Sequence, residues 1–374
     1  MVFAQERKLL ESHGHEVVTY QRSNKELLTC SRFERLNLPR KMVWAKDSHR
    51  DLTEVLRKEK PDVVHVHNTF VQISPSIFSA CRQAGVPVVQ TLHNFRLMCP
   101  AATFFRDGKI CEECRESSLW RGIQHACYHQ SHGATAAVAL MLTVHRQART
   151  WVNEVTVYIA LSQFSRRKFT DGGLPAAKIR VKPNFVAPDP GERNGSGEGA
   201  VFVGRLSPEK GLKTLLQAWH HLPAPIPLQI FGDGPQRAEL EQMASDLNLS
   251  SVTFRGHVNH DTTQTAIKNA HVLILPSECY ENFPMTIVEA LSCGTPVICS
   301  RLGAMQEIVT HLETGLHFTP GNPEDLAEKL AWAWDHPAKL ENLGKAGRRE
   351  YEQKYTAENN YSELMSIYDQ AINA

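Results

Sequence analysis

The sequence predicts an α/β protein with two doubly wound domains, each built on a parallel sheet. Short runs of apolar and β-branched residues alternate with helix-length amphipathic stretches, which is typical of βαβ units. Near-continuous apolar runs, such as Val272–Pro276, suit strands that are buried on both faces. The length of 374 residues exceeds what one hydrophobic core usually serves, so two domains are expected.

The apolar runs predict strands in both halves of the chain. In the first half the predicted strands are Glu16–Tyr20, Val63–His67, Val88–His93, Val155–Ser162 and Ile179–Lys182. In the second half they are Ala200–Gly204, Leu228–Phe231, Val252–Phe254, Val272–Pro276, Val297–Ser300 and Leu316–Phe318. The segments between them have the length of crossover helices, which parallel strands require.

Residues 184–199 are rich in Pro, Gly, Asn and Ser, a composition that breaks helices and strands and indicates a linker. We therefore expect an N-terminal domain over residues 1–183, with a cysteine-rich insertion at 99–132, and a second domain over 200–355. Residues 356–374 predict a final helix that packs back toward the N-terminal domain. Open sheets of this kind bind ligands at the carboxyl ends of their strands, so a cleft between the domains is expected.

The chain opens with a predicted helix whose apolar residues include Val2, Phe3, Leu9 and Leu10. Gly14 is suited to end it, since glycine adopts the left-handed conformation of a helix C-cap. A nucleotide-binding α/β half normally places a strand and a Gly-rich turn before its first helix, and neither precedes this one.

The composition excludes several classes of protein. Lys and Arg total 41 against 40 Asp and Glu, and this balance argues against a nucleic-acid-binding protein. No apolar run is long enough for a transmembrane helix, and the N-terminus lacks the apolar core of a secretory signal. Nine cysteines in such a chain suggest reduced thiols or a metal site, so a cytoplasmic location is expected.

The segment from Glu278 to Val297 carries the most chemical information. Pro284 is suited to the first position of a helix that Cys293-Gly294 ends, which leaves Glu281 in the preceding loop and Glu289 on the helix. Both carboxylates can therefore face one cleft, and the amides at the helix N-terminus suit an anion. For an isolated pair of glutamates, solvated helix-end carboxylates would be the better interpretation.

Cationic residues follow the first predicted strand of the second domain. Arg205 and Lys210 lie in the loop after Ala200–Gly204, where a guanidinium and an ammonium can together neutralise a diphosphate. A salt-bridged surface loop is the alternative. The turn at Gly232-Asp233-Gly234 ends another strand and by itself indicates little.

Taken together, these segments resemble the retaining glycosyltransferases of family four, which have the GT-B fold of two Rossmann-like domains facing a cleft. The family's most specific mark, Glu-x7-Glu, is matched by Glu281 and Glu289. The segments VGRLSPEKGL, FGDGP, FRGHV, LPS and EALSCGTPVICS also look like family counterparts, in the family's order. The resemblance extends from PDVVHVHN to the C-terminal helix and so covers nearly the whole chain.

The resemblance implies roles for individual residues. Arg205 and Lys210 would bind the diphosphate of a UDP-, GDP- or ADP-linked sugar, and Glu289 the ribose hydroxyls. Glu281 would act near the reacting centre, and His93 would face the donor sugar, although a lone histidine after a strand is more often structural. The segment that would orient the sugar hydroxyls comprises Asn282, Phe283, Pro284 and Met285.

The reaction implied is transfer of a hexose from a nucleoside diphosphate to an acceptor hydroxyl, with the anomeric configuration retained. Such enzymes often build cell-envelope polysaccharides or glycolipids, so a glycan or lipid-linked acceptor is expected. The sequence contains no Asp-x-Asp motif, so no catalytic metal is indicated and no cofactor is required. The charge of the leaving group would then be balanced by Arg205, Lys210 and the helix dipole.

Four cysteines between residues 99 and 127 have the spacing of a structural zinc site: Cys99, Cys111, Cys114 and Cys127. A long excursion with few periodic apolar residues would be stabilised by such an ion. Four reduced cysteines in a surface loop are an equal alternative. Disulfides suit a cytoplasmic protein less well.

The apolar stretch Gly133–Trp151 predicts a helix of the core, with a helix resting on the inner membrane face as the alternative. The family's opening strand and Gly-rich loop are missing, which predicts either a start upstream of Met1 or an incomplete active site. The rival functions are therefore a non-catalytic remnant that binds a nucleotide sugar, or another enzyme on this fold, such as an epimerase or a phosphorylase.

Overall fold

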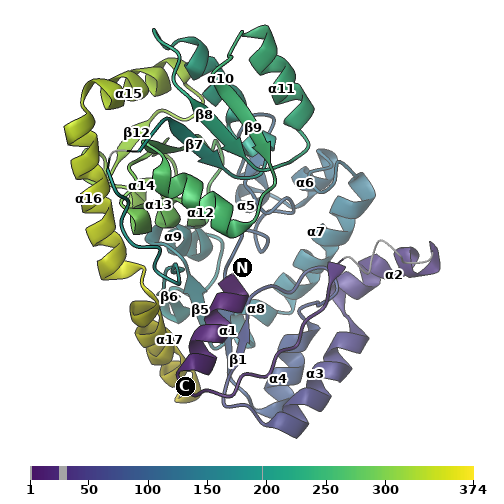
Figure 1. The fold of residues 1–374 in the computed structure, drawn as a ribbon. Helices are drawn as coiled ribbons and strands as arrows, with labels where there is room; N and C mark the ends of the chain where they lie inside the picture. Colours follow the sequence, from purple (N-terminus) through teal and green to yellow (C-terminus); the bar gives the residue numbers. More distant parts are fainter. Residues whose placement is uncertain (1, 25–31, 196) are drawn as a thin grey trace. The chain divides into compact units, whose positions relative to one another are not determined.

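The structure is a computed structural model that describes residues 2–24, 32–195 and 197–374 (Figure 1). It divides into two compact units. Unit 1 comprises Met1–Phe104, Cys111–Lys182 and Tyr361–Ala374, and unit 2 comprises Phe105–Ile110 and Pro183–Asn360. Each unit has its own parallel sheet, as the α/β prediction requires.

Unit 1 is built on a sheet of four parallel strands in the order β1-β2-β5-β6. These are β1 (Val64–Val66), β2 (Val88–Thr91), β5 (Val157–Ala160) and β6 (Ile179–Val181). Strands β2 and β5 are buried along their whole length, because helices cover both faces of a parallel sheet. Each strand lies inside its predicted segment and is shorter by a residue or more.

The helices of unit 1 connect these strands and surround the sheet. Their ends follow local signals: Gly85 ends α4 at φ 70°, and the Ser162 hydroxyl caps α9 by accepting from the Ser165 amide at 3.0 Å. The helices are α1 (Val2–Ser12), α2 (Arg32–Val43), α3 (Lys46–Glu59), α4 (Ser76–Ala84), α5 (Glu113–Glu116), α6 (Trp120–Gln124), α7 (His132–Gln147), α8 (Thr150–Asn153), α9 (Gln163–Asp171) and the 3-10 turn η2 (Ala176–Lys178).

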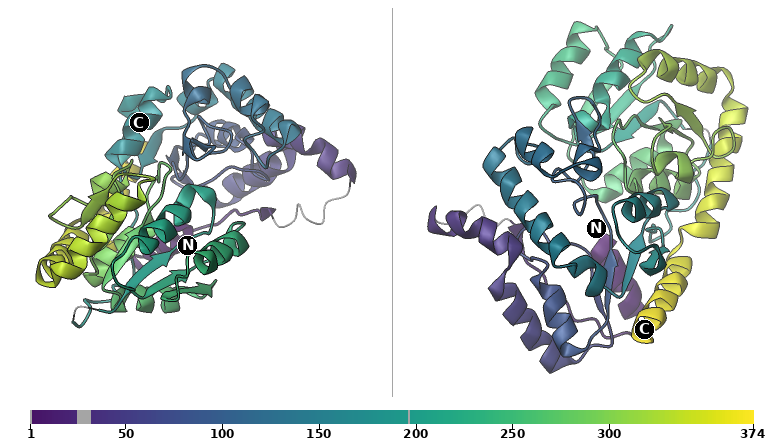
Figure 2. Two further views of the ribbon diagram at one scale, coloured as in Figure 1. Left: turned by 90° about the horizontal axis from the view of Figure 1, so that it is seen from above. Right: turned by 180° about the vertical axis from the view of Figure 1, so that it is seen from behind.

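The two ends of the chain meet within unit 1. Helix α17 (Ala357–Ile372) lies beside α1 in Figure 1 and in the right view of Figure 2. Tyr361 stacks on the ring of His13 with centroids 3.7 Å apart, and its hydroxyl lies 2.8 Å from His15 Nε2. From Tyr361 onward, the final helix is therefore part of the same unit as the first.

The predicted strand Glu16–Tyr20 is wrong. The segment follows α1 and pairs with no strand among the residues that the structure describes, and Val18 keeps 47% of its surface exposed. A strand requires hydrogen bonds to a neighbouring strand, and the four-stranded sheet provides none here. The alternation of apolar residues in a segment does not show whether a neighbouring strand is there to pair with it.

Unit 2 has a six-stranded parallel sheet in the order β12-β11-β10-β7-β8-β9. Its strands are β7 (Ala200–Val203), β8 (Leu228–Phe231), β9 (Val252–Gly256), β10 (Val272–Leu275), β11 (Val297–Ser300) and β12 (Leu316–Phe318). All six were predicted within two residues at either end. Strand β7 lies in the middle of the sheet, between β10 and β8, so the loops after β7 and β10 leave the same edge side by side.

The chain moves outward from β7 through β8 to β9, then returns to β10 and moves outward the other way. Since parallel crossovers are right-handed, this reversal puts the helices of the two halves on opposite faces of the sheet. Helices α12 and α13 accordingly lie together on one face (Figure 1). The helices of unit 2 are η3 (Pro208–Lys210), α10 (Leu212–His220), α11 (Arg237–Asp246), α12 (His260–Asn269), α13 (Met285–Cys293), α14 (Met305–Ile308), α15 (Pro323–Asp335) and α16 (Pro337–Lys354).

The segment expected as a linker, residues 184–199, is fastened to unit 2. Asp189 accepts two hydrogen bonds from the guanidinium of Arg348 on α16, at 2.6 and 2.7 Å. The Arg193 guanidinium donates to the carbonyl of Ala270 at 2.7 Å. Bidentate Arg–carboxylate pairs are among the more geometrically defined ion pairs, so the part from Asp189 to Arg193 has a fixed course.

A two-stranded hairpin within residues 99–132 was not predicted. Strands β3 (Phe105–Arg106) and β4 (Lys109–Ile110) pair antiparallel around Asp107-Gly108, which have φ of 51° and 74°. Asp-Gly is a strong signal for a tight hairpin turn that needs positive φ at both central residues. The strands themselves are too short for a periodic pattern.

Candidate functional site

The predicted cation and the predicted carboxylate of unit 2 form a contact. Lys210, at the end of the loop after β7, places its Nζ 2.5 Å from Glu281 Oε1 in the loop after β10. The same carboxylate oxygen accepts from the Ser277 hydroxyl at 2.6 Å. Burial lowers the pKa of Lys210, but the adjacent Glu281 carboxylate more than offsets this and raises the pKa above its ordinary value. Lys210 is therefore a fixed positive charge.

Glycines allow the loops after β7, β8 and β10 to pack directly on one another. Gly232 has φ 137°, and a Cβ there would lie 1.8 Å from the carbonyl oxygen of Gly204. A Cβ on Gly234 would meet the Leu206 carbonyl at 2.3 Å, and one on Gly211 would meet the Pro276 carbonyl at 2.0 Å. The Gly-x-Gly turn, weak as a motif, is thus needed for backbone contact between the loops.

Helix α13 begins at Met285, one residue after the position that the sequence predicts. Pro284 is its N-cap, and Gly294, at φ 70°, ends it. Asn282 and Pro284 are buried while Phe283 and Met285 are partly exposed, so the segment is held in place beside Glu281. The amides of the first turn have no acceptor within the helix, which makes this N-terminus suitable for a polar or anionic ligand group.

Glu289, on the second turn of α13, is 5% exposed. Burial raises its pKa, and the neighbouring His260 acts in the opposite direction. The nearest atoms of this pair, His260 Nδ1 and Glu289 Oε1, are 3.9 Å apart. A buried carboxylate with so distant a partner is costly for the fold, which is typical of functional sites.

Arg205 keeps an exposed side chain in the loop after β7. Its own carbonyl accepts a hydrogen bond from the amide of Ser207, which holds the turn that leads to Lys210. The guanidinium is therefore available to a ligand at this loop, whereas Lys210 is already engaged with Glu281.

His93 lies in unit 1, directly after β2. Its Nε2 is 2.9 Å from Nδ1 of His67, which follows β1. Both rings line a small pocket together with Gln90, whose Oε1 is buried and has no hydrogen-bond partner among the described residues. An unsatisfied buried amide oxygen beside a histidine suits a ligand that carries hydroxyl groups.

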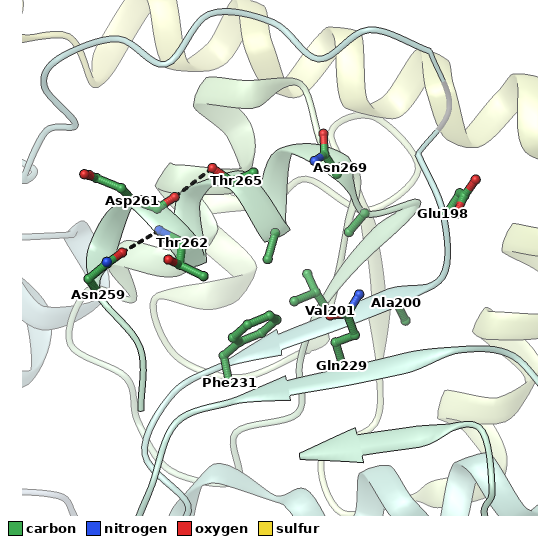
Figure 3. A pocket seen from close by; sticks show the side chains of 12 residues that line it. Glu198, Ala200, Val201, Gln229, Phe231, Asn259, Asp261, Thr262, Thr265 and Asn269 are labelled. Carbon is green, nitrogen blue, oxygen red and sulfur yellow. Dashed lines mark hydrogen bonds between the residues drawn. The ribbon is translucent and has the colours of Figure 1, made fainter. Parts of the chain in front are cut away.

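A larger hollow of unit 2, shown in Figure 3, is distinct from the site around Glu281. It lies between α12 and the β7–β8 part of the sheet and is lined by small side chains such as Ala200 and Thr265. Its polar groups are largely engaged within α12: Asn259 caps the helix by accepting from the Thr262 amide at 2.8 Å. None of the residues predicted to bind a donor lines it.

The four cysteines of the predicted zinc site share one neighbourhood. Burial raises the pKa of Cys114 to about 12, and the thiols of Cys99, Cys127 and Cys111 contribute to this increase. However, in the described part of the chain only one group of three or more possible metal ligands has its ligand atoms within 4.8 Å of one another. This group consists of Glu6, His65 and His67 and contains no cysteine. No three of the four thiols meet this limit, although their chemistry suits Zn²⁺.

Helix α7 buries Val138, Met141 and Leu142, and Leu140 is 52% exposed. It packs against α2, α6 and α8 of unit 1, as expected for a helix of the core. Among the residues that the structure describes, no helix is long and apolar enough to cross a membrane.

Several residues of these sites were not singled out from the sequence. Ser277 lies in the LPS segment that supports the resemblance, and His260 follows FRGHV, so both were close to recognised motifs. Glu6 gave no signal, because a glutamate in an N-terminal helix is ordinarily on the surface. The buried contact of Glu6 with His67 depends on the packing of α1 against the sheet.

The fold and the Lys210–Glu281 site define a GT-B protein of the glycosyltransferase class. The comparisons agree: the model for Glycosyltransferase Family 4 matches residues 2–190, and that for Glycosyl transferases group 1 matches 188–350. The chain therefore belongs to glycosyltransferase family 4, with the GT-B fold of two Rossmann-like domains.

Curated relatives and solved structures support this assignment. An uncharacterized glycosyltransferase, MJ1607, from Methanocaldococcus jannaschii is 24% identical over 96% of this chain and 88% of its own length. The D-rhamnosyltransferase WbpZ from Pseudomonas aeruginosa is 32% identical, over 42% of this chain and 41% of its own. The structure of HepE from Anabaena with UDP matches with a TM-score of 0.67 at 19% identity, over 96% of this chain and 88% of that one.

Proposed function

We propose that this glycosyltransferase transfers a sugar from a nucleoside-diphosphate sugar to an acceptor hydroxyl and retains the anomeric configuration. The observation that carries the proposal is the contact between Lys210 and Glu281 beside the N-terminus of α13. It joins a cation and a carboxylate at the place where a parallel sheet binds its ligands. HepE, a structural neighbour, was solved with UDP and with UDP-glucose.

Donor binding is proposed to use the groups of unit 2. Arg205 and Lys210 bind the diphosphate, Glu289 accepts hydrogen bonds from the ribose, and the segment from Asn282 to Met285 orients the sugar. Glu281 touches the sugar near the reacting centre and also holds the Lys210 ammonium, which it contacts directly. The nucleotide can be a uridine, guanosine or adenosine diphosphate.

The proposed mechanism needs no metal ion between the phosphates. As the bond between the sugar and the phosphate breaks, negative charge grows on the diphosphate, and Arg205, Lys210 and the α13 dipole stabilise it. The departing phosphate oxygen takes the proton of the acceptor hydroxyl on the same face of the sugar, which gives retention. Turnover is expected to persist when Mg²⁺ and Mn²⁺ are omitted.

The acceptor is proposed to enter at unit 1, where the pocket beside His93 and Gln90 is suited to hydroxyl groups. A glycan or a lipid-linked glycan of cell-envelope polysaccharide or glycolipid synthesis is the proposed class. The contact of His93 with the donor sugar, the cytoplasmic location and the contact with the inner membrane face stay predictions.

The test is a transfer assay with purified chain, a panel of UDP-, GDP- and ADP-sugars, and short glycan and lipid-linked acceptors. Product mass identifies the transferred sugar, and proton NMR of the anomeric centre reports its configuration. We expect a product with the configuration of the donor. Inverted product would contradict retention, and binding of the donor without any transfer across the panel would favour a non-catalytic protein.

A further inference from the structure

Glu6 is a buried carboxylate that the proposed function does not use. It lies on α1 and is 3% exposed, with Oε1 3.3 Å from Nζ of Lys182, whose side chain is also 3% exposed. Its second oxygen, Oε2, is 3.5 Å from Nε2 of His67. Buried charges are stable only when paired, so Glu6 is held between a cation and an imidazole.

His67 connects Glu6 to His93. Its Nδ1 is 2.9 Å from Nε2 of His93, so the two ring nitrogens of His67 contact different partners. Burial lowers the pKa of His67 to about 2 and also lowers the pKa of His93, so both rings are neutral at physiological pH. A neutral imidazole has one N–H donor and one acceptor nitrogen.

The charge of Glu6 decides the direction of the hydrogen bond between the two rings. Its Oε2 lies 3.5 Å from Nε2 of His67, an electrostatic contact and not a hydrogen bond, and the negative charge favours the proton of His67 on that nitrogen. The Nδ1 atom of His67 is then an acceptor, and His93 must donate to it through Nε2. We infer that Glu6 is a positioning residue that fixes this chain, so that His93 presents an unprotonated Nδ1 as a hydrogen-bond acceptor.

A metal ion is the alternative occupant of the cluster, because ligand atoms of Glu6, His65 and His67 lie within 4.8 Å of one another. Two observations disfavour it. Both ring nitrogens of His65 are already engaged, Nδ1 with the Tyr368 hydroxyl at 2.8 Å and Nε2 with the Thr91 hydroxyl at 2.7 Å. The Lys182 ammonium also stands beside the carboxylate where a cation would bind.

The consequence for transfer rests on the proposed function. His93 lines the pocket that contains the unsatisfied Oε1 of Gln90, so both residues would accept hydrogen bonds from substrate hydroxyls. Two neighbouring acceptors would favour a ligand group that carries hydroxyls at this position of the pocket. Glu6 thus determines which ring nitrogen of His93 carries the proton, without contacting the substrate.

The direct test is NMR of the intact chain with ¹⁵N-labelled histidine, because proton–nitrogen correlations distinguish the two neutral tautomers. His67→Gln and His93→Gln assign the two rings. We expect both His67 and His93 to carry their proton on Nε2. A proton on Nδ1 of either ring would overturn the inference, as would signals of both rings that shift when one equivalent of Zn²⁺ is added.

Paired variants test whether Glu6 is responsible. The double variant Glu6→Leu, Lys182→Met removes both buried charges together, which avoids leaving one unpaired. The control, Arg7→Met with Glu11→Leu, removes an exposed ion pair from the same helix. We expect a mixture of tautomers at His93 only in the first variant. An unchanged single tautomer there would overturn the role of Glu6.

A second pair of variants tests the contact between His67 and His93 without any change in α1. His67→Asn retains an acceptor near the position of Nδ1, whereas His67→Ala removes it. We expect the Nε2–H form of His93 in the asparagine variant and its loss in the alanine variant. The same result in both would overturn the coupling between the two rings.

Activity provides a separate readout. We expect the Glu6→Leu, Lys182→Met chain to lose at least tenfold in kcat, while donor sugars still stabilise it as they do the wild type. If this variant transfers sugar at the rate of the wild type while His93 is a mixture of tautomers, the proposed effect of Glu6 on catalysis is wrong. If the wild type itself transfers no sugar, the proposed function fails, and the tautomer result stands on its own.

Discussion

Lys210 and Glu281 contact each other at 2.5 Å although 70 residues separate them in the chain, because β7 and β10 are neighbours in the sheet of unit 2. The loops that follow these strands therefore leave the same edge and meet. The pair holds an ammonium in a defined position, and that position is next to the N-terminus of α13. This is the arrangement expected of a site that stabilises a diphosphate.

Removal of either partner should abolish most of the transfer activity. We expect Lys210→Ala and Glu281→Ala to lower kcat by about 100-fold or more, as does removal of other preorganised groups that stabilise developing charge. The fold should persist in Lys210→Ala, since Ser277 still bonds Glu281 when Lys210 is absent. Lys213→Ala is the matched control, because Lys213 forms an exposed pair with Glu239. Turnover like that of the wild type in either site variant would refute that assignment.

Glu289 should make the fold less stable as pH rises. Burial raises its pKa above the usual 4.5, so the folded chain binds this proton more tightly than the unfolded chain does. Stability therefore falls as pH increases from that value through the folded pKa. We expect Glu289→Gln to have a higher melting temperature than the wild type at pH 7. The difference in melting temperature should disappear near pH 4.

The same substitution should remove donor binding, because the proposed role of Glu289 is to accept hydrogen bonds from the ribose. Thermal unfolding with and without nucleotide sugar measures both effects in one experiment. A variant that is less stable than the wild type at pH 7, or that keeps the full donor response, would contradict this account of Glu289.

Gly232→Ala should damage unit 2 through its backbone. The new Cβ would lie 1.8 Å from the Gly204 carbonyl, at a φ of 137° that side chains rarely adopt. We expect a loss of about 2 kcal/mol or more in the free energy of unfolding. Gly133→Ala in α7 is the control, since its Cβ meets nothing within 4 Å. Equal melting temperatures for the two variants would show that the loops do not require this glycine.

The cysteine cluster should contain about one zinc ion per chain in protein purified without chelators. Cys99, Cys111, Cys114 and Cys127 are the proposed ligands, and an ion would stabilise the excursion they belong to. Cys114→Ser should lower both zinc content and melting temperature. Cys81→Ser, at a buried cysteine outside the cluster, should leave the zinc content unchanged. Zinc content far below one per chain in the wild type would end the proposal.

The sequence predicted most of the architecture because its strands are buried. Apolar runs such as Leu228–Phe231 and Val297–Ser300 match β8 and β11 without any shift. The error at Glu16–Tyr20 arose because periodicity reports the side chains of a segment and not the strand beside it. The short hairpin β3–β4 was missed because two-residue strands give no pattern.

The candidate site residues could be proposed from the sequence where they belong to short motifs. Glu281, Glu289 and Lys210 all belong to segments that resemble family counterparts, and the Lys210–Glu281 contact follows from strand order. Glu6 could not be found in this way, because its burial results from the packing of α1 near β6, where Lys182 follows. A contact of this kind, between a helix and a strand end, has no local pattern in the sequence.

The most direct test of the central claim is thermal unfolding of the chain with UDP-, GDP- and ADP-sugars, in the wild type and in Arg205→Ala. A ligand that binds only the folded state raises the melting temperature by mass action. We predict a shift with the sugars of one nucleotide, lost in Arg205→Ala and kept in the Lys213→Ala control. No shift with any donor, or an equal shift in Arg205→Ala, would contradict a donor site at this loop of unit 2.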